Sequence, residues 1–162
     1  MSFALRIDGQ GWRSVDGPDD VGGGETYSPT PPEATIEQVR RLAWSSIKAE
    51  RDRRAESGCC VDDYWYHNDV KSRTQWERMA NRSAMDADDE PYCVDGSQVH
   101  WKTMSGEFVP LTAGLIRRVV AAFEIQEVAV FKAAEAHRAA LMVAVDPSEY
   151  DYRAGWPPVF GE

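Results

Sequence analysis

The cysteines and histidines of this sequence are the residues best suited to metal or nucleophilic chemistry. Six residues separate Cys60 from His67, and six separate Cys93 from His100. Two thiolates and two imidazoles form a valid ligand set for zinc. Structural zinc ligands usually lie two to four residues apart on one turn, so these pairs would have to converge from separate parts of the chain. We therefore expect no metal site.

A nucleophilic cysteine is the second chemistry that these residues could support. Cys59 or Cys60 could pair with His67 as a thiolate and an imidazolium. An activated cysteine usually needs a cationic neighbour or the amino end of a helix, whereas Asp62 and Asp63 place negative charge beside this thiol pair. We expect neither cysteine to act as a catalytic nucleophile.

Two other segments have the composition of a ligand site without its spacing. The glycine run at residues 22–24 follows no strong strand and precedes no helix, so it does not predict a phosphate-binding loop. The acidic run at residues 86–90 lacks the alternating acceptors and the central glycine of a calcium-binding loop. The sequence predicts a protein that is not an enzyme and holds no cofactor.

The overall charge limits the classes of partner. The 162 residues include 27 acidic and 18 basic side chains, for a formal net charge of −9 at pH 7. A field of this sign repels phosphate backbones and anionic lipids. Basic residues gather between Arg40 and Arg54, but Glu50 and Asp52 interleave with them, as on an ion-paired surface. No apolar run approaches the roughly 20 residues that cross a bilayer. We expect neither nucleic acid nor a membrane as a partner.

Residues 1–34 are expected to form a small N-terminal β-hairpin and a linker. Phe3, Leu5 and Ile7 alternate with other residues as in a half-buried strand, and the segment from Trp12 to Val15 can return beside it. The following glycine, proline and acidic residues predict an extended linker without regular structure. Two strands alone are marginally stable in water, so the hairpin needs a surface to pack against.

Residues 35–162 are predicted to contain three helices and two short β-hairpins, which makes the fold class α+β. The helices begin after Thr35, Asp69 and Thr112, and the third runs for about 31 residues, or roughly 46 Å. The hairpins are expected at residues 59–66 and 99–109. The acidic segment at 83–98 is expected to be a mobile loop.

Apolar side chains form one stripe along the whole third helix when residues are placed at 100° intervals. The stripe holds Ile116, Val119, Val120, Phe123, Val130, Phe131, Ala134 and Leu141. Glu127 lies on the same stripe, where a buried carboxylate costs several kcal/mol unless it is paired. The half before Glu127 is expected to pack on the hairpins and helices, and the half after it to meet a different surface. Heptad spacing along this stripe is too irregular for a self-sufficient coiled coil.

Two surfaces could cover the second half of the third helix. The aromatic C-terminal tail, at residues 150–160, could fold back on it, with an arginine of the first helix pairing with Glu127. Alternatively, another protein chain could cover it. The sequence leaves both alternatives open.

Motifs in a fixed order carry a resemblance to known proteins. They read IKAERDRR at 47–54, WYHND at 65–69, KSRTQ at 71–75, WKTM at 101–104, VPLT at 109–112 and GWP at 155–157. Together, over residues 35–160, they resemble an uncharacterised domain of tailed-bacteriophage proteins encoded near tail-fibre genes. The opening residues 3–8, with Gly11, Trp12 and Arg13, are similar to the start of phage tail-fibre assembly proteins.

This resemblance implies a role in the phage tail and no catalytic residues. The leading hypothesis is a non-enzymatic tail-fibre assembly protein, a chaperone or cap, that binds a tail-fibre subunit or another tail protein in the cytoplasm of the bacterial host. The alternative is a structural component of the virion, retained on the tail or baseplate. The sequence makes no prediction of oligomeric state. The predicted partner-binding residues are Phe3, Leu5, Ile7, Trp12, Val130, Phe131, Ala134 and Leu141.

Overall fold

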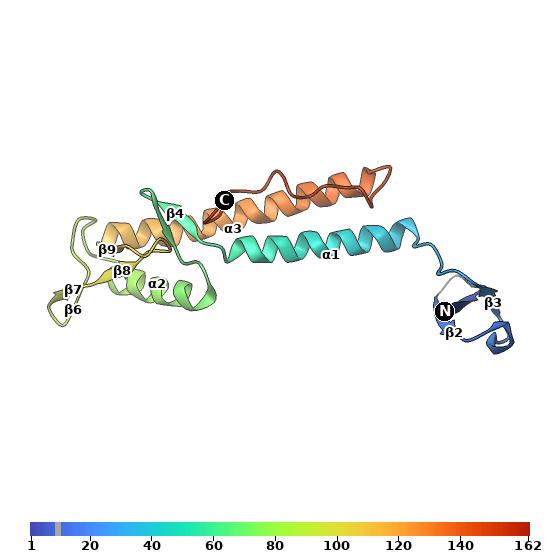
Figure 1. Cartoon of the computed structure of the whole chain (residues 1–162). Helices are drawn as coiled ribbons and strands as arrows, with labels where there is room; N and C mark the ends of the chain where they lie inside the picture. Colours follow the sequence, from blue (N-terminus) through green and yellow to red (C-terminus); the bar gives the residue numbers. More distant parts are fainter. Residues whose placement is uncertain (9–10) are drawn as a thin grey trace. The chain divides into compact units, whose positions relative to one another are not determined.

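The computed structural model describes residues 1–8 and 11–162 (Figure 1). They divide into two compact units, Met1–Val39 and Arg40–Glu162. The described residues form an α+β fold with three α-helices and several short antiparallel strand pairs, as the sequence predicts.

The first unit is an antiparallel sheet of three strands in the order β2-β1-β3. β1 (Ser2–Arg6) pairs with β2 (Trp12–Val15), which confirms the predicted hairpin. The prediction of an unstructured linker after it is wrong in part. That segment contains a 3-10 helix, η1 (Pro18–Asp20), and the third strand, β3 (Glu25–Ser28), which pairs with the other edge of β1.

An ion pair explains why the glycine-rich segment folds back onto the sheet. Arg13 donates from Nε and one Nη to the two carboxylate oxygens of Glu25, at 3.0 and 2.8 Å. The amide of Gly22 donates to the same carboxylate at 2.9 Å. Glu25, one of the acidic residues on which the prediction of an extended linker rested, therefore attaches this segment to β2.

Helix α1 (Ile36–Ala55) begins after Thr35, as predicted, and its first turn is closed by a capping box. The amide of Thr35 donates to Oε1 of Gln38 at 2.8 Å, and the amide of Gln38 donates to Oγ1 of Thr35 at 3.2 Å. The chain leaves the helix through Gly58, whose φ of +92° is a left-handed conformation that glycine adopts without strain.

The two predicted hairpins and the second helix also form. β4 (Cys59–Val61) and β5 (Tyr64–Tyr66) are joined by Asp62 and Asp63, both with positive φ, as a tight two-residue turn requires. Asp69 caps α2 (Val70–Arg82) by accepting from the amides of Lys71 and Ser72. β8 (His100–Lys102) and β9 (Phe108–Pro110) form the other hairpin.

The acidic segment at residues 83–98 is more ordered than predicted. It contains a further hairpin of β6 (Cys93–Val94) and β7 (Ser97–Gln98). Arg117 of the long helix donates to the carbonyls of Ser83 and Asp86, both at 3.0 Å, and to a carboxylate oxygen of Asp88. Gly114 allows the close approach, because a Cβ there would lie only 2.8 Å from the carbonyl oxygen of Asp88.

Helix α3 (Ala113–Val143) supplies one side of the core of the second unit. Its first half packs against the hairpins and α2 around Trp76, which is fully buried. The Trp76 ring lies 5.5 Å from Tyr66, 4.6 Å from Trp101 and 6.4 Å from Phe123, measured between centroids. This confirms the expected packing of the half that precedes Glu127.

The second half of α3 is covered by α1 and by the C-terminal tail (Figure 1). Ile47, Ala134 and Leu141 form the buried centre, with Tyr150, Tyr152 and Trp156 packed against it. Of the two alternatives left open by the sequence, the structure shows the first: the C-terminal tail covers the second half of α3.

The partner of Glu127 differs from the expected one. Its carboxylate accepts from an Nη of Arg73 at 2.8 Å, and Arg73 belongs to α2, not to the first helix. The arginines of α1 lie beside the later turns of α3, as Arg51 does beside Phe131, so an α2 residue is the nearer donor. Glu127 remains half-exposed, so the stripe is interrupted at the surface and no lone carboxylate is buried.

Candidate protein-binding surfaces

One face of the three-stranded sheet carries large apolar side chains. Opposed residues in antiparallel strands point to the same side, and the register pairs Leu5 with Trp12 and Phe3 with Ser14. The rings of Phe3 and Trp12 meet edge to face, with centroids 5.2 Å apart. Ile7 continues the alternation beyond β1, where its amide donates to the carbonyl of Gly24. We call Phe3, Leu5, Ile7 and Trp12 the apolar sheet face.

The apolar sheet face is incompletely covered. Phe3 is buried, but Trp12 is 53% exposed and Ile7 is 74% exposed. A three-stranded sheet has too few neighbouring side chains to enclose residues of this size. Four of the predicted partner-binding residues therefore lie together, and two of them are open to solvent.

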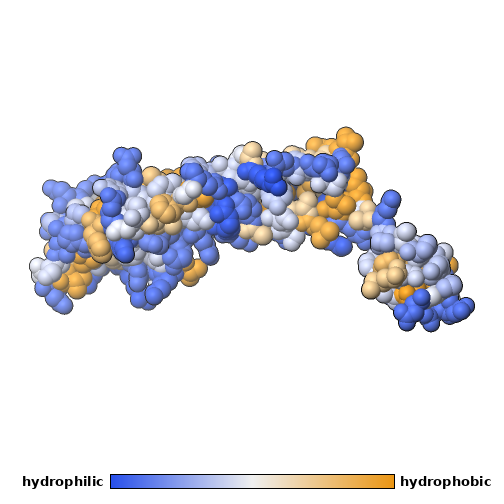
Figure 2. Space-filling model, viewed as in Figure 1, coloured by the Kyte–Doolittle hydropathy of each residue, from blue (hydrophilic) through white to orange (hydrophobic). Residues whose placement is uncertain are grey.

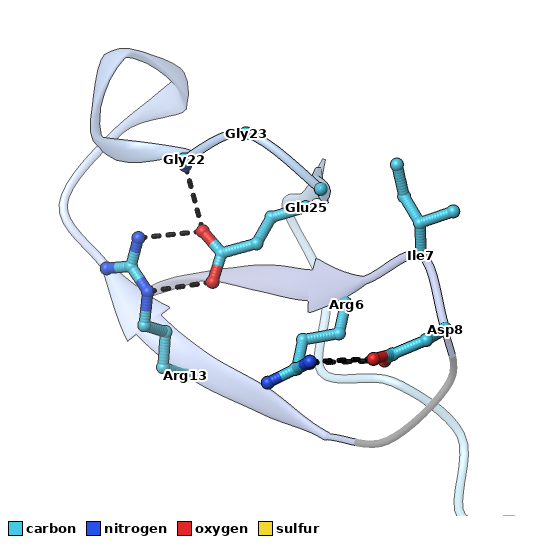
Figure 3. A pocket seen from close by; sticks show the side chains of 8 residues that line it. Arg6, Ile7, Asp8, Arg13, Gly22, Gly23 and Glu25 are labelled. Carbon is cyan, nitrogen blue, oxygen red and sulfur yellow. Dashed lines mark hydrogen bonds and ion pairs between the residues drawn. The ribbon is translucent and has the colours of Figure 1, made fainter.

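The opposite side of the same sheet carries the charged residues Arg6, Arg13 and Glu25 together with the partly exposed Tyr27. A depression of about 700 Å³ is lined by Arg6, Ile7, Asp8, Arg13, Glu25 and the glycines at 22–24 (Figure 3). Arg6 donates to both oxygens of Asp8, and Arg13 to both oxygens of Glu25. The hydrogen bond from Arg13 also holds the pKa of Glu25 below its usual value. The two arginines of this depression are paired with its two carboxylates, so their charges are already balanced within the sheet.

The second predicted partner-binding region needs correction. Val130, Ala134 and Leu141 are buried within the chain, because α1 and the tail cover that side of α3. Only Phe131 of this group remains accessible, at 45% exposure. Cζ of Arg51 lies 4.7 Å from its ring centroid, and a groove of about 560 Å³ runs past it between Glu124, Val128 and Lys132.

Helix α3 also carries an exposed apolar surface that was not predicted from the sequence. Ile125, Val128 and Met142 are all more than half exposed, and they lie away from the buried stripe. The signal was present in the sequence as a second apolar series at helical spacing, about 130° around the helix from the first.

The cysteines and histidines do not assemble into a metal centre. Within residues 1–8 and 11–162, no three His, Cys, Asp or Glu side chains lie where they could hold one ion. Cys60 and Cys93 are exposed, whereas Cys59 is buried and its burial raises the pKa of the thiol to about 12. His67 and His100 line one shallow pocket of about 440 Å³.

The helices of the described residues include none that is both long and apolar enough to span a membrane.

Comparison with known proteins places most of the chain in one family. Residues 38–154 match the model of a domain of unknown function, DUF4376. No curated protein and no solved structure matches the chain. Because the match runs from the first turn of α1 to the C-terminal tail, the chain belongs to the DUF4376 family.

Proposed function

We propose that this protein is a non-enzymatic assembly factor of a bacteriophage tail. It binds a tail-fibre subunit through the apolar sheet face and acts in the cytoplasm of the bacterial host while the tail is assembled. The proposal rests on the resemblance of residues 3–13 and 35–160 to phage tail proteins, together with the properties of that face.

The observation that carries the proposal is the exposure of Trp12 and Ile7 beside Phe3 and Leu5. Burying a large apolar side chain against a partner contributes about 1.5–3 kcal/mol. Trp is enriched among residues that dominate binding energy at protein interfaces. A partner with an apolar groove or an exposed strand end would cover both exposed side chains at once.

The chemistry of the rest of the chain supports a binding role. The charged side chains that line the depression pair with one another, Arg6 with Asp8 and Arg13 with Glu25. The buried thiol of Cys59 has a raised pKa, which opposes formation of the nucleophilic thiolate.

Co-expression with the tail-fibre subunit encoded beside its gene tests the proposal. We expect soluble fibre trimers with the wild-type protein, and a large loss of soluble trimer with Ile7→Asp or Trp12→Asp. Ile7 lies outside the strands and is mostly exposed, so the Ile7→Asp variant is expected to keep the sheet folded.

Tyr27→Asp is the matched control. Tyr27 pairs with Ala4 and therefore lies on the other face of the same sheet, and it is also partly exposed. This variant is expected to support trimer formation normally. Fibre trimers of unchanged yield and solubility without the protein would overturn the assembly role. Stoichiometric amounts of the protein in purified particles would favour a structural component instead.

A further inference from the structure

An entire side of α3 is open to solvent over about six turns. Seven residues on this side, all exposed, form what we call the open stripe: Ala121, Ile125, Val128, Lys132, Glu135, Ala139 and Met142. At 100° per residue they lie within about 50° of one line. That line is about 135° around the helix from the stripe that α1, α2 and the tail cover. Elements of the same unit therefore leave it free.

The spacing of the open stripe is that of a helix pairing seam. Its members follow one another at intervals of four and three residues, which is the a and d pattern of a heptad repeat. Ile125 is 70% exposed, and Val128 and Met142 are more than half exposed. Figure 2 shows hydrophobic surface over the part of the second unit in which α3 ends. Val143 and Val145, at the end of this helix, are also exposed.

The two charged members of the open stripe are arranged about its centre. Lys132 and Glu135 are three residues apart and are flanked on both sides by apolar members. If a second α3 runs antiparallel with its centre at the same point, Ile125 meets Met142 of the other copy and Val128 meets Ala139. In the same alignment, Lys132 meets Glu135 of the other copy twice, once on each side of the two-fold axis.

We infer that the open stripe binds a second copy of this chain, with the two α3 helices antiparallel about an axis between Lys132 and Glu135. A two-fold interface uses one patch twice, so the patch must complement itself. The open stripe does so in shape, because it sets large apolar residues against small or flexible ones, and in charge, because it sets Lys132 against Glu135. A parallel pair would set Lys132 against Lys132 instead.

The geometry also sets the strength of the association. The open stripe is about 32 Å long at 1.5 Å per residue, which is shorter than the contact of an obligate dimer. Two charge pairs at the centre specify orientation more than they add affinity. We therefore expect a reversible dimer that dissociates on dilution through the micromolar range.

Lys132 and Glu135 can be exchanged without disturbing the monomer. Both are exposed, and the ion pair of Glu135 with Arg138 spans 3.5 Å between side chains that are each more than half exposed. Such a pair contributes little to stability. Changes in association caused by substituting these residues therefore report on the second copy.

Sedimentation equilibrium of the full chain from about 1 to 300 μM tests the inference. The wild-type protein is expected to dimerise. Lys132→Glu and Glu135→Lys are each expected to weaken the dimer about tenfold, because each turns two attractive contacts into two repulsive ones. The double variant Lys132→Glu/Glu135→Lys restores both contacts and is expected to restore the wild-type dissociation constant. An equal mixture of the two single variants is expected to form heterodimers at near wild-type affinity.

Ile125→Asp tests the apolar part of the open stripe. It is expected to weaken the dimer more than about 100-fold, because two carboxylates then enter the contact. Leu42→Asp is the matched control: Leu42 is 66% exposed on α1, outside the open stripe, and its substitution leaves the dimer unchanged. Circular dichroism checks that both variants keep the wild-type helix content. A wild-type monomer over the whole concentration range, or a double variant no better than the single ones, would overturn the inference.

Discussion

Two tryptophans in this protein make the same aromatic contact in opposite surroundings. Trp12 meets Phe3 edge to face at 5.2 Å and 85°, and Trp76 meets Tyr66 edge to face at 5.5 Å and 90°. Yet Trp12 is 53% exposed, whereas Trp76 is fully buried. The pairwise geometry is almost identical, so it does not decide burial.

The number of packed layers around each tryptophan explains the difference in burial. Trp76 lies between two hairpins and α3, and it touches Trp101 and Phe123 as well as Tyr66. Trp12 lies on a single sheet, where Phe3 is its aromatic neighbour. A tryptophan in several layers stabilises the fold, and a tryptophan on one layer remains available to a partner.

Substitution of the two tryptophans is the strongest test of this comparison. Trp76→Ala is expected to lower the free energy of unfolding by about 3–5 kcal/mol, because it empties the centre of the aromatic core. Trp12→Ala is expected to leave the stability of the second unit within about 0.5 kcal/mol of wild type. Urea unfolding followed by far-ultraviolet circular dichroism measures both.

Trp76→Phe sharpens this prediction. The indole nitrogen of Trp76 is buried without a hydrogen-bond partner, so phenylalanine removes an unsatisfied donor while keeping an aromatic ring. We expect the phenylalanine variant to retain more than half of the stability that alanine loses. Equal losses for alanine at positions 12 and 76 would contradict the layer argument.

Two arginines extend the comparison from rings to charges. Arg54 is buried, donates to the carbonyl of Pro157 at 3.0 Å and to a carboxylate oxygen of Glu162 at 2.8 Å, and lies 5.6 Å from the Trp156 ring centroid. Arg13 makes its two-pronged contact with Glu25 from a half-exposed position on the sheet. Arg54 therefore holds the tail to α1, whereas Arg13 connects two edges of an open sheet.

Arg54→Met is expected to cost about 2 kcal/mol, less than removal of Trp76, because the two carboxylates it leaves behind, of Glu50 and Glu162, remain partly hydrated. Hydrogen exchange should show the tail, residues 150–162, losing protection before the aromatic core does. Arg13→Met is expected to cost less stability than Arg54→Met, because Arg13 is half-exposed, and to leave the tail protected. Unchanged tail protection in Arg54→Met would show that apolar contacts alone hold the tail.

Local signals in the sequence predicted the ends of the helices well. Thr35, Asp69 and Thr112 each accept from a backbone amide within three residues, so a short stretch of sequence contains the whole interaction. The aspartate pair at 62 and 63 defines its turn in the same way.

Long-range partners were the source of the errors. β3 forms where Glu25 meets Arg13, 12 residues earlier, and the acidic segment is held by Arg117 from 29 to 34 residues away. No window of sequence shows such pairs. For the candidate site, the angular stripe grouped Phe131 with Val130, although one is exposed and the other buried. The position of α1 in the folded chain decides which side of α3 is covered, and the angles along the helix do not contain that information.

The smallest expected effect is on the pH dependence of unfolding. It distinguishes two glutamates that are each paired with arginine, Glu50 and Glu25. Hydrogen bonds from Arg53, and then from Arg54, hold the pKa of Glu50 at about 2, below its ordinary 4.5. Because the pKa is lower in the folded state, Glu50 stabilises the fold above about pH 4.5, and this contribution disappears as the pH falls toward 2.

Glu50→Gln is therefore expected to be about 1 kcal/mol less stable than wild type at pH 7, with the difference closing between pH 4.5 and 2. Glu25→Gln is the control, because the pKa of Glu25 is also lowered by an arginine but its pair lies on the exposed sheet. It should leave the unfolding of the second unit unchanged at every pH. Urea titrations at a series of pH values measure both variants, and a stability difference for Glu50→Gln that persists at pH 2 would assign its effect to packing rather than to charge.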